Sequence, residues 1–249
     1  MLVSFLICAM DHRPWRRLKQ IVEKQIAESG FECEVLVNTD SGQYTSGEKR
    51  NELTLRASGE YIAFIDDDDD VEKGYVDSLC IEIQKSHPDV VSFSMMFLNS
   101  KNRKKEIWRL GLHEDSRVHG KMSVNHLCCW KKEVASKVAW CESLGYGDDQ
   151  IWYQPLVASR SDLVCVSIPR VLYRYNFNPS LTLNQTTNRV ESSRKYFGDG
   201  LRCFMISPGE ILIEDGSQKF NVINCRDRNN KTFCVDTKNE VPFYTVRLK

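Results

Sequence analysis

Tyr61-Ile62-Ala63-Phe64-Ile65-Asp66-Asp67-Asp68-Asp69-Asp70 joins an apolar run to five consecutive carboxylates. The apolar half is typical of a strand buried on both faces of a parallel sheet, and ligand sites in open α/β sheets lie just beyond the carboxyl ends of such strands. Adjacent carboxylates repel one another unless a cation intervenes, and Mg²⁺ or Mn²⁺ binds carboxylates together with substrate phosphates. The junction therefore predicts a divalent metal site. The alternative is an acidic turn that caps the following helix.

Strand-like and helical segments alternate around this junction. We expect strands over 2–9, 34–37, 61–65, 90–93, 124–130 and 163–175, and helices over 14–30, 46–57, 76–83, 132–139 and 149–159. The polar, basic stretch 99–121 is expected to form a hairpin or a mobile loop. This alternation predicts the α/β class, with a mostly parallel central sheet and helices on both faces.

The pattern changes after about residue 200. Short alternating runs at 211–213, 220–223, 232–235 and 244–246 are separated by turn-like residues, which predicts a small antiparallel β appendage. We therefore expect a main domain over 1–185, divided into halves over about 1–98 and 99–185, and a linker with the β-rich appendage over 186–249.

Composition excludes some classes of protein. The 249 residues carry 34 Lys and Arg and 34 Asp and Glu, so no net charge draws the chain to nucleic acid or membranes. None of the ten cysteines forms a CxxC pair, which gives a structural zinc site no support. The apolar run 2–10 lacks a basic segment before it, and no segment is long enough to cross a membrane. A reducing cytoplasm is the expected location.

Several motifs occur in an order typical of one enzyme family. Gly47-Glu48-Lys49-Arg50-Asn51 precedes Ala57-Ser58-Gly59-Glu60-Tyr61-Ile62 and the acidic run. Gly147-Asp148-Asp149-Gln150-Ile151-Trp152 and Leu172-Tyr173-Arg174-Tyr175 follow. Together these motifs resemble the family 2 glycosyltransferases of the GT-A fold, over roughly residues 2–183. The resemblance implies a GT-A-type Rossmann-like sandwich that binds a nucleotide diphosphate sugar with Mn²⁺ or Mg²⁺.

The resemblance assigns roles in donor and metal binding. Asp66 and Asp68 match the outer acids of an Asp-x-Asp triplet, with Asp68 expected to coordinate the metal and Asp66 to contact the ribose or sugar. A shift of one residue within the run stays open, which keeps Asp67 among the donor-binding candidates. The other donor-binding candidates are Met10, Asp11, Asn38, Asp40 and Arg50. For Asp40 the alternative is a turn residue, and for Arg50 it is a surface position.

Other candidates lie on the acceptor side. Asp149 matches the family's general base, which removes the proton of the attacking hydroxyl, and Asp148 stands beside it; the alternative is that both cap a helix. His126, Trp152 and Arg174 are acceptor-side candidates. A structural His126 and a core Trp152 are the alternatives for the first two.

These assignments predict an inverting glycosyltransferase that moves a sugar, most simply from a UDP-sugar, to a hydroxyl of a glycan or another acceptor. A GT-A-like nucleotidyltransferase is disfavoured because 8–13 contains no glycine. A nucleotide-sugar binding protein without turnover is a third hypothesis. The basic region 101–132 leaves a hydroxylated base in DNA as a minority acceptor, reached by extruding the base. The identity of the sugar and the oligomeric state are not predicted.

Overall fold

The computed structural model describes residues 2–112, 119–142, 148–158 and 162–178, and the backbone of 201–207, 210–215, 218–222 and 246–248. The chain divides into two compact units. Unit 1 comprises Met1–Gln43, Glu52–Lys137 and Asp162–Ser180; unit 2 comprises Tyr44–Asn51, Val138–Ser161 and Leu181–Lys249. The predicted domain boundary at residues 185 and 186 lies outside the described residues.

Unit 1 contains one mixed sheet of nine strands. The strands are β1 (Val3–Met10), β2 (Cys33–Asp40), β3 (Tyr61–Asp66), β4 (Asp70–Val71), β5 (Val90–Asn99), β6 (Lys105–Gly111), β7 (Lys121–Ser123), β8 (Cys129–Lys131) and β9 (Cys165–Phe177). Their order is β2-β1-β3-β8-β5-β6-β7, and β9 pairs with both β5 and β4. The helices in the described residues are α1 (Trp15–Ser29), α2 (Ser46–Arg56), α3 (Tyr75–Ser86), α4 (Lys132–Ala135) and α5 (Asp148–Ala158).

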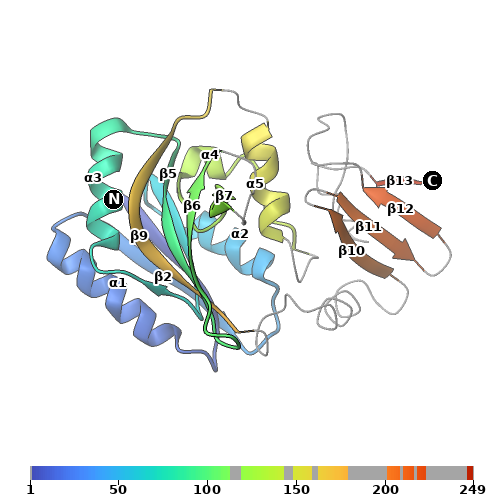
Figure 1. The fold of residues 1–249 in the computed structure, drawn as a ribbon, viewed down its shortest axis with the longest axis horizontal. Helices are drawn as coiled ribbons and strands as arrows, with labels where there is room; N and C mark the ends of the chain where they lie inside the picture. The colour runs from blue at the N-terminus through green and yellow to red at the C-terminus, as the bar shows by residue number, and fades with distance from the viewer. Residues whose placement is uncertain are drawn as a thin grey trace. The chain divides into compact units, whose positions relative to one another are not determined.

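The parallel strands β2, β1 and β3 place the predicted site at one edge of the sheet. Met10 lies opposite Asp40, and Cys8 lies opposite Asp66, so the carboxyl ends of all three strands meet. The apolar half of the opening motif is fully buried in β3. The helices α1 and α3 contact each other and lie on one side of the sheet, with α4 on the other side (Figure 1). The predicted α/β class is therefore confirmed.

The prediction of one strand over 124–130 is wrong, because Asn125 turns the chain. Its side-chain oxygen accepts the Leu127 N–H at 2.9 Å, and its carbonyl accepts the indole N–H of Trp130 at 2.8 Å. Only β8 remains of this strand, and it runs antiparallel between β3 and β5. The helix expected over 132–139 is also shorter, since α4 ends in a tight turn in which the Lys137 N–H bonds the Val134 carbonyl.

The first part of the stretch 99–121 forms the expected hairpin, because β6 pairs antiparallel with β5, from Ser94 opposite Arg109 to Leu98 opposite Lys105. Residues 113–118 lie outside the described residues. In unit 2 the strands β10 (Leu201–Ser207), β11 (Glu210–Asp215), β12 (Gln218–Val222) and β13 (Val246–Leu248) form an antiparallel sheet in sequence order. This sheet confirms the predicted β appendage, although the run 232–235 lies outside the described residues.

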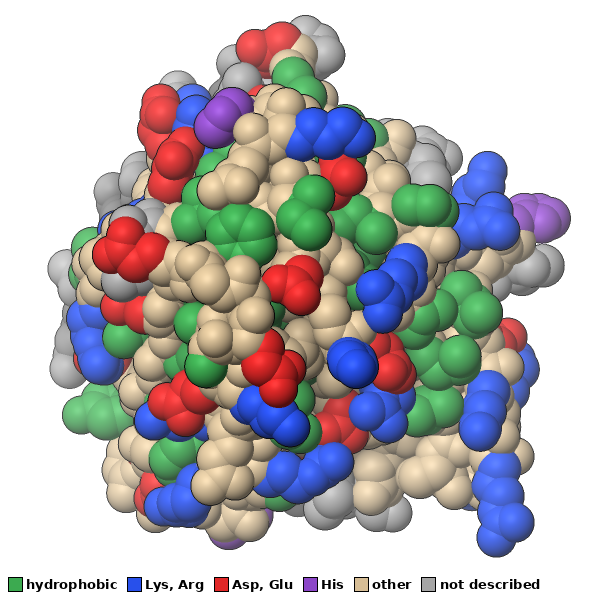
Figure 2. Space-filling view, turned by 90° about the vertical axis from the view of Figure 1, so that its left-hand side faces the viewer, with side chains coloured by type: hydrophobic (Ala, Val, Ile, Leu, Met, Phe, Trp, Pro, Cys, Tyr) green, Lys and Arg blue, Asp and Glu red, His purple; other side chains and the backbone are tan. Residues whose placement is uncertain are grey.

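Acidic and basic side chains are interspersed on the face drawn in Figure 2, in line with the balanced composition. Within the described ranges, none of the helices has the length and apolar character needed to span a membrane. Six cysteines there are free, and Cys141 is disulfide-bonded. The reducing cytoplasm therefore stays a prediction.

Candidate active site

The chain turns sharply after β3, and we call residues Asp66–Asp69 the acidic turn. The Asp69 N–H bonds the Asp66 carbonyl at 3.1 Å, which closes the turn. None of its carboxylates caps the next helix, because α3 follows Gly74 without a side-chain capping bond. Asp70 begins β4 and pairs with the exposed Arg17 at 3.0 Å. The alternative of a helix cap is therefore wrong.

Asp67 is bound on both of its oxygens. One accepts the backbone N–H of Met10 at 2.7 Å, and the other accepts Arg13 at 2.8 Å. Only 5% of its side chain is exposed. Asp67 therefore ties the acidic turn to the end of β1. No motif of the sequence marked the role of Arg13.

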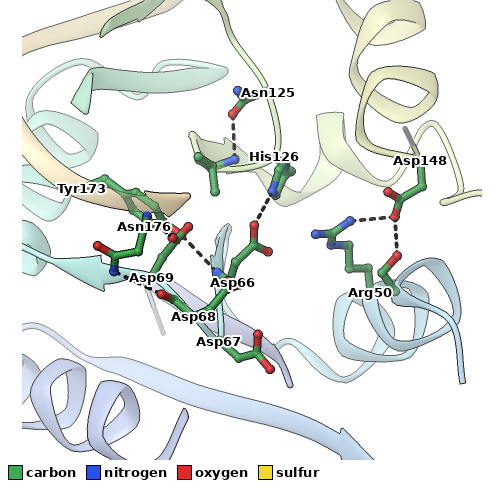
Figure 3. Close-up of polar contacts among 12 residues, drawn as sticks. Arg50, Asp66, Asp67, Asp68, Asp69, Asn125, His126, Asp148, Tyr173 and Asn176 are labelled. Atoms are coloured by element: carbon green, nitrogen blue, oxygen red, sulfur yellow. Dashed lines mark hydrogen bonds and ion pairs between the residues drawn. The ribbon is translucent and has the colours of Figure 1, made fainter. Parts of the chain in front are cut away.

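Asp69 is buried and is held by β9. The Tyr173 hydroxyl donates to one carboxylate oxygen at 2.8 Å, and the Asn176 N–H donates to the other at 2.7 Å. The Asn176 side chain also donates to the Asp68 carbonyl at 3.1 Å (Figure 3). Burial, and then repulsion from Asp66 and Asp68, raises the pKa of Asp69 well above its usual range. These contacts fix the second half of the turn.

Asp66 and Asp68 are the more exposed members of the turn, with 24% and 33% of their side chains accessible. Asp66 contacts the Nε2 atom of the buried His126 at 3.1 Å, and Asp68 contacts Arg13 at 3.0 Å. Burial, followed by repulsion from Asp66, raises the pKa of Asp68 to about 6, although Arg13 opposes the rise. The turn thus presents two carboxylates that repel each other.

These two carboxylates fit a hard divalent cation. Such an ion uses one or two carboxylates and takes its other ligands from substrate phosphates and water. The raised pKa of Asp68 marks negative charge that a cation would offset. In the part of the chain that the structure describes, no group of three or more His, Cys, Asp or Glu is arranged to hold a metal. Asp66 and Asp68 would therefore hold the ion with ligands from the substrate.

Three donor-binding candidates meet at the ends of β1 and β2. The Asp11 N–H bonds the carbonyl of the buried Asp40 at 2.9 Å. The exposed Asp11 carboxylate accepts the hydroxyls of Thr39 and Ser41, each at 2.7 Å, and these bonds lower its pKa. Met10 precedes Asp11 and bonds Asp67. No motif of the sequence marked the hydroxyls that orient Asp11.

Asn38 and Arg174 have other contacts. The Asn38 amide donates to the Glu52 carboxylate in the same unit. Arg174 lies on β9 opposite Asp70 and forms an ion pair with Glu72 at 2.9 Å. Neither contact involves the acidic turn, and the donor role of Asn38 and the acceptor role of Arg174 stay predictions.

In unit 2, Arg50 and Asp148 are bound to each other. Arg50 donates to Asp148 at 2.7 Å, and Ser46 donates to the same oxygen at 2.9 Å (Figure 3). Both charged side chains are buried. The geometry does not fit the expectation that Arg50 reaches the donor phosphates or that Asp148 takes part in the chemistry, because each neutralises the other.

Asp149 is the second residue of α5 and is partly exposed. Trp152, one turn further, is 1% exposed and stacks on Trp140 with ring centroids 4.4 Å apart and planes 8° apart. The alternative of a core aromatic therefore describes Trp152 better than a wall for an acceptor sugar. Among the three predicted site residues of α5, Asp148 and Trp152 are buried, and Asp149 is partly exposed.

No protein-family model matches this chain, and no curated protein does. Solved structures of S. aureus TarS residues 1–349 are similar. The complex with UDP has a TM-score of 0.55 at 14% identity over 79% of this chain and 71% of TarS. The complex with UDP-GlcNAc has a TM-score of 0.54 at 14% identity over 71% of this chain and 59% of TarS. A third structure, of residues 1–349 alone, has a TM-score of 0.53 at 15% identity over 71% and 60%. At this identity the likeness shows the fold, which is of the GT-A type.

Proposed function

We propose that this chain is an inverting glycosyltransferase of the family 2 type that uses a nucleotide diphosphate sugar. The observation that carries the proposal is the acidic turn at the carboxyl edge of β3. Asp67 and Asp69 hold the turn through their hydrogen bonds, whereas Asp66 and Asp68 are more exposed and repel each other. Such a pair suits a cation that accompanies a diphosphate.

The donor is expected to be a UDP-sugar. Met10, Asp11 and Asp40 lie at the ends of adjacent parallel strands, where nucleotides bind in open α/β sheets. The oriented Asp11 carboxylate can accept hydrogen bonds from a base or a ribose. The complexes of TarS with UDP and UDP-GlcNAc support this choice of nucleotide.

Asp68 would hold Mn²⁺ or Mg²⁺ directly, and Asp66 would contact the ion or the donor sugar. When bound, the ion supplies Lewis acidity that neutralises charge on the departing diphosphate. His126 bonds Asp66 and orients its carboxylate. Arg13 lies between Asp67 and Asp68, where its charge reduces the repulsion in the turn before the cation enters.

Asp149 would act as the general base. As the acceptor oxygen attacks the anomeric carbon, its proton passes to the Asp149 carboxylate, and the bond from that carbon to the diphosphate breaks on the opposite side. Asp148 is bound to Arg50 and Ser46, so its role is structural in this proposal. A nucleotide-sugar binding protein is the second candidate, because the acidic turn serves binding as well as turnover.

A donor-hydrolysis assay separates the two functions. The purified chain, incubated with a panel of UDP-sugars and Mn²⁺, is expected to release UDP from at least one donor. We expect EDTA to stop the release and added Mn²⁺ to restore it. Asp68→Asn should lower the rate by roughly 10²–10³-fold, whereas the matched control Asp70→Asn should retain it, because Asp70 contacts only the exposed Arg17 among the contacts described. Tight UDP binding without release from any donor would favour the binding protein.

A further inference from the structure

The first turn of α5 is anchored by its leading residue. Asp148 is buried, and one of its carboxylate oxygens accepts hydrogen bonds from both Arg50 and Ser46. Consecutive residues of a helix point about 100° apart, so the direction of Asp148 determines the direction of Asp149. The buried ion pair thus sets where the Asp149 carboxylate is aimed.

Arg50 also contacts α5 indirectly, through two stacked tryptophans. Its guanidinium carbon lies 4.6 Å from the ring centroid of Trp140, in the geometry of a cation–π contact. Trp140 in turn stacks on Trp152, which lies in α5 one turn after Asp148. One guanidinium therefore holds the start of α5 directly and the next turn indirectly.

The start of the helix that carries Arg50 is itself held within unit 2. Asn51 accepts the Trp140 N–H at 2.8 Å and donates to the Trp140 carbonyl at 3.0 Å. Gly47 allows a close approach, because a Cβ there would lie 2.1 Å from the Cys141 carbonyl oxygen. Thr45 and Glu48 form a capping box, in which each side chain accepts the backbone N–H of the other residue. The start of α2 is thus a rigid support for Arg50.

We propose that Arg50 is a positioning residue, which orients Asp149 for proton removal through its ion pair with Asp148 and its contact with Trp140. This assignment rests on the proposed function. It replaces the expectation that Arg50 binds the donor phosphates, because its buried guanidinium already contacts Asp148 and Trp140. It also gives a common role to Gly47, Arg50, Asn51 and Asp148: together they support the orientation of the Asp149 carboxylate.

The test compares Arg50→Met and Arg50→Lys with Arg56→Met, a control at the exposed end of the same helix. UDP affinity is measured by calorimetry, and kcat and donor KM are measured with an active UDP-sugar. We expect Arg50→Met to lower kcat by roughly 10–100-fold, because a displaced base misses the reacting atoms. UDP affinity should stay within about twofold of the wild type. Lysine keeps the charge and should recover part of kcat, and Arg56→Met should match the wild type.

Asp148→Asn gives the same test if Arg50→Met does not fold, as judged by circular dichroism and melting. It preserves the shape of the side chain and should also lower kcat at constant UDP affinity. Loss of UDP affinity in the Arg50 variants would assign Arg50 to the donor and overturn the inference, as would wild-type kcat in Arg50→Met. A wild-type chain that turns over no donor would instead refute the proposed function on which the inference rests.

Discussion

Asp149→Asn is expected to lower kcat by roughly 10²–10⁴-fold, the range that a general base contributes. Asparagine cannot accept the proton of the attacking hydroxyl at neutral pH. The lost carboxylate in the first turn of α5 interacts with the helix dipole, which is worth about 0.3–1 kcal/mol, so the free energy of unfolding should fall by no more than that amount. The measurement is kcat with a UDP-sugar and acceptor, alongside urea unfolding of both proteins.

The control for this variant is Asp77→Asn, which removes an acid from the first turn of α3. It reproduces the change at a helix start without the proposed chemistry, and its kcat should equal that of the wild type. If Asp149→Asn keeps kcat within about tenfold of the wild type, Asp149 serves only the start of α5, and the base must be sought elsewhere.

Asp68→Asn and Asp67→Asn are expected to shift stability in opposite directions at pH 7.5. Asp68→Asn removes a carboxylate that burial and Asp66 destabilise. It should stabilise the fold by about 1 kcal/mol, less than the ~3 kcal/mol of a fully buried group, because a third of the side chain is exposed. In Asp67→Asn, the N–H of either Met10 or Arg13 faces the NH₂ group of asparagine, which cannot accept a hydrogen bond. The variant should therefore destabilise the fold by about 1–3 kcal/mol.

The effect of Asp68→Asn should depend on pH. The pKa of Asp68 is about 6 in the folded state against an ordinary value of 3.8, so the folded state binds the proton more tightly. The wild type therefore gains stability as the pH falls through 6 towards 4, and the advantage of the variant should shrink over the same range. Urea unfolding without divalent metal at pH 7.5, 6 and 4.5 measures it. An Asp68→Asn variant less stable than the wild type at pH 7.5 would contradict this account of the turn.

The sequence predicted that the acidic turn follows a buried strand, because the signals are local. An apolar β-type run that ends in carboxylates marks a buried strand and its carboxyl end, and the structure has β3 over Tyr61–Asp66. The alternation of segments likewise predicted the class of the fold and the β appendage. It could not predict the turn at Asn125, where the side-chain oxygen accepts a backbone N–H and the backbone carbonyl accepts an indole N–H, because the apolar pattern of this segment indicates a strand.

The separate roles of the identical aspartates could not be read from the sequence. They differ in the partners that distant parts of the chain supply. The Asp67–Arg13 pair is separated by 54 residues and the Asp69–Tyr173 pair by 104. The pairing of Arg50 with Asp148 across 98 residues was missed for the same reason. A charged residue within a motif indicates function by its type, but burial and its counter-charge decide whether it faces a ligand.

The most direct measurement of the central claim is a crystal structure with UDP and Mn²⁺, in which anomalous scattering locates the manganese. One Mn²⁺ is expected at about 2 Å from a carboxylate oxygen of Asp68 and from the diphosphate, with Asp66 on the same side and Asp67 and Asp69 still bound to Met10 and Tyr173. A diphosphate bound away from Asp66 and Asp68, with no manganese between them, would contradict it.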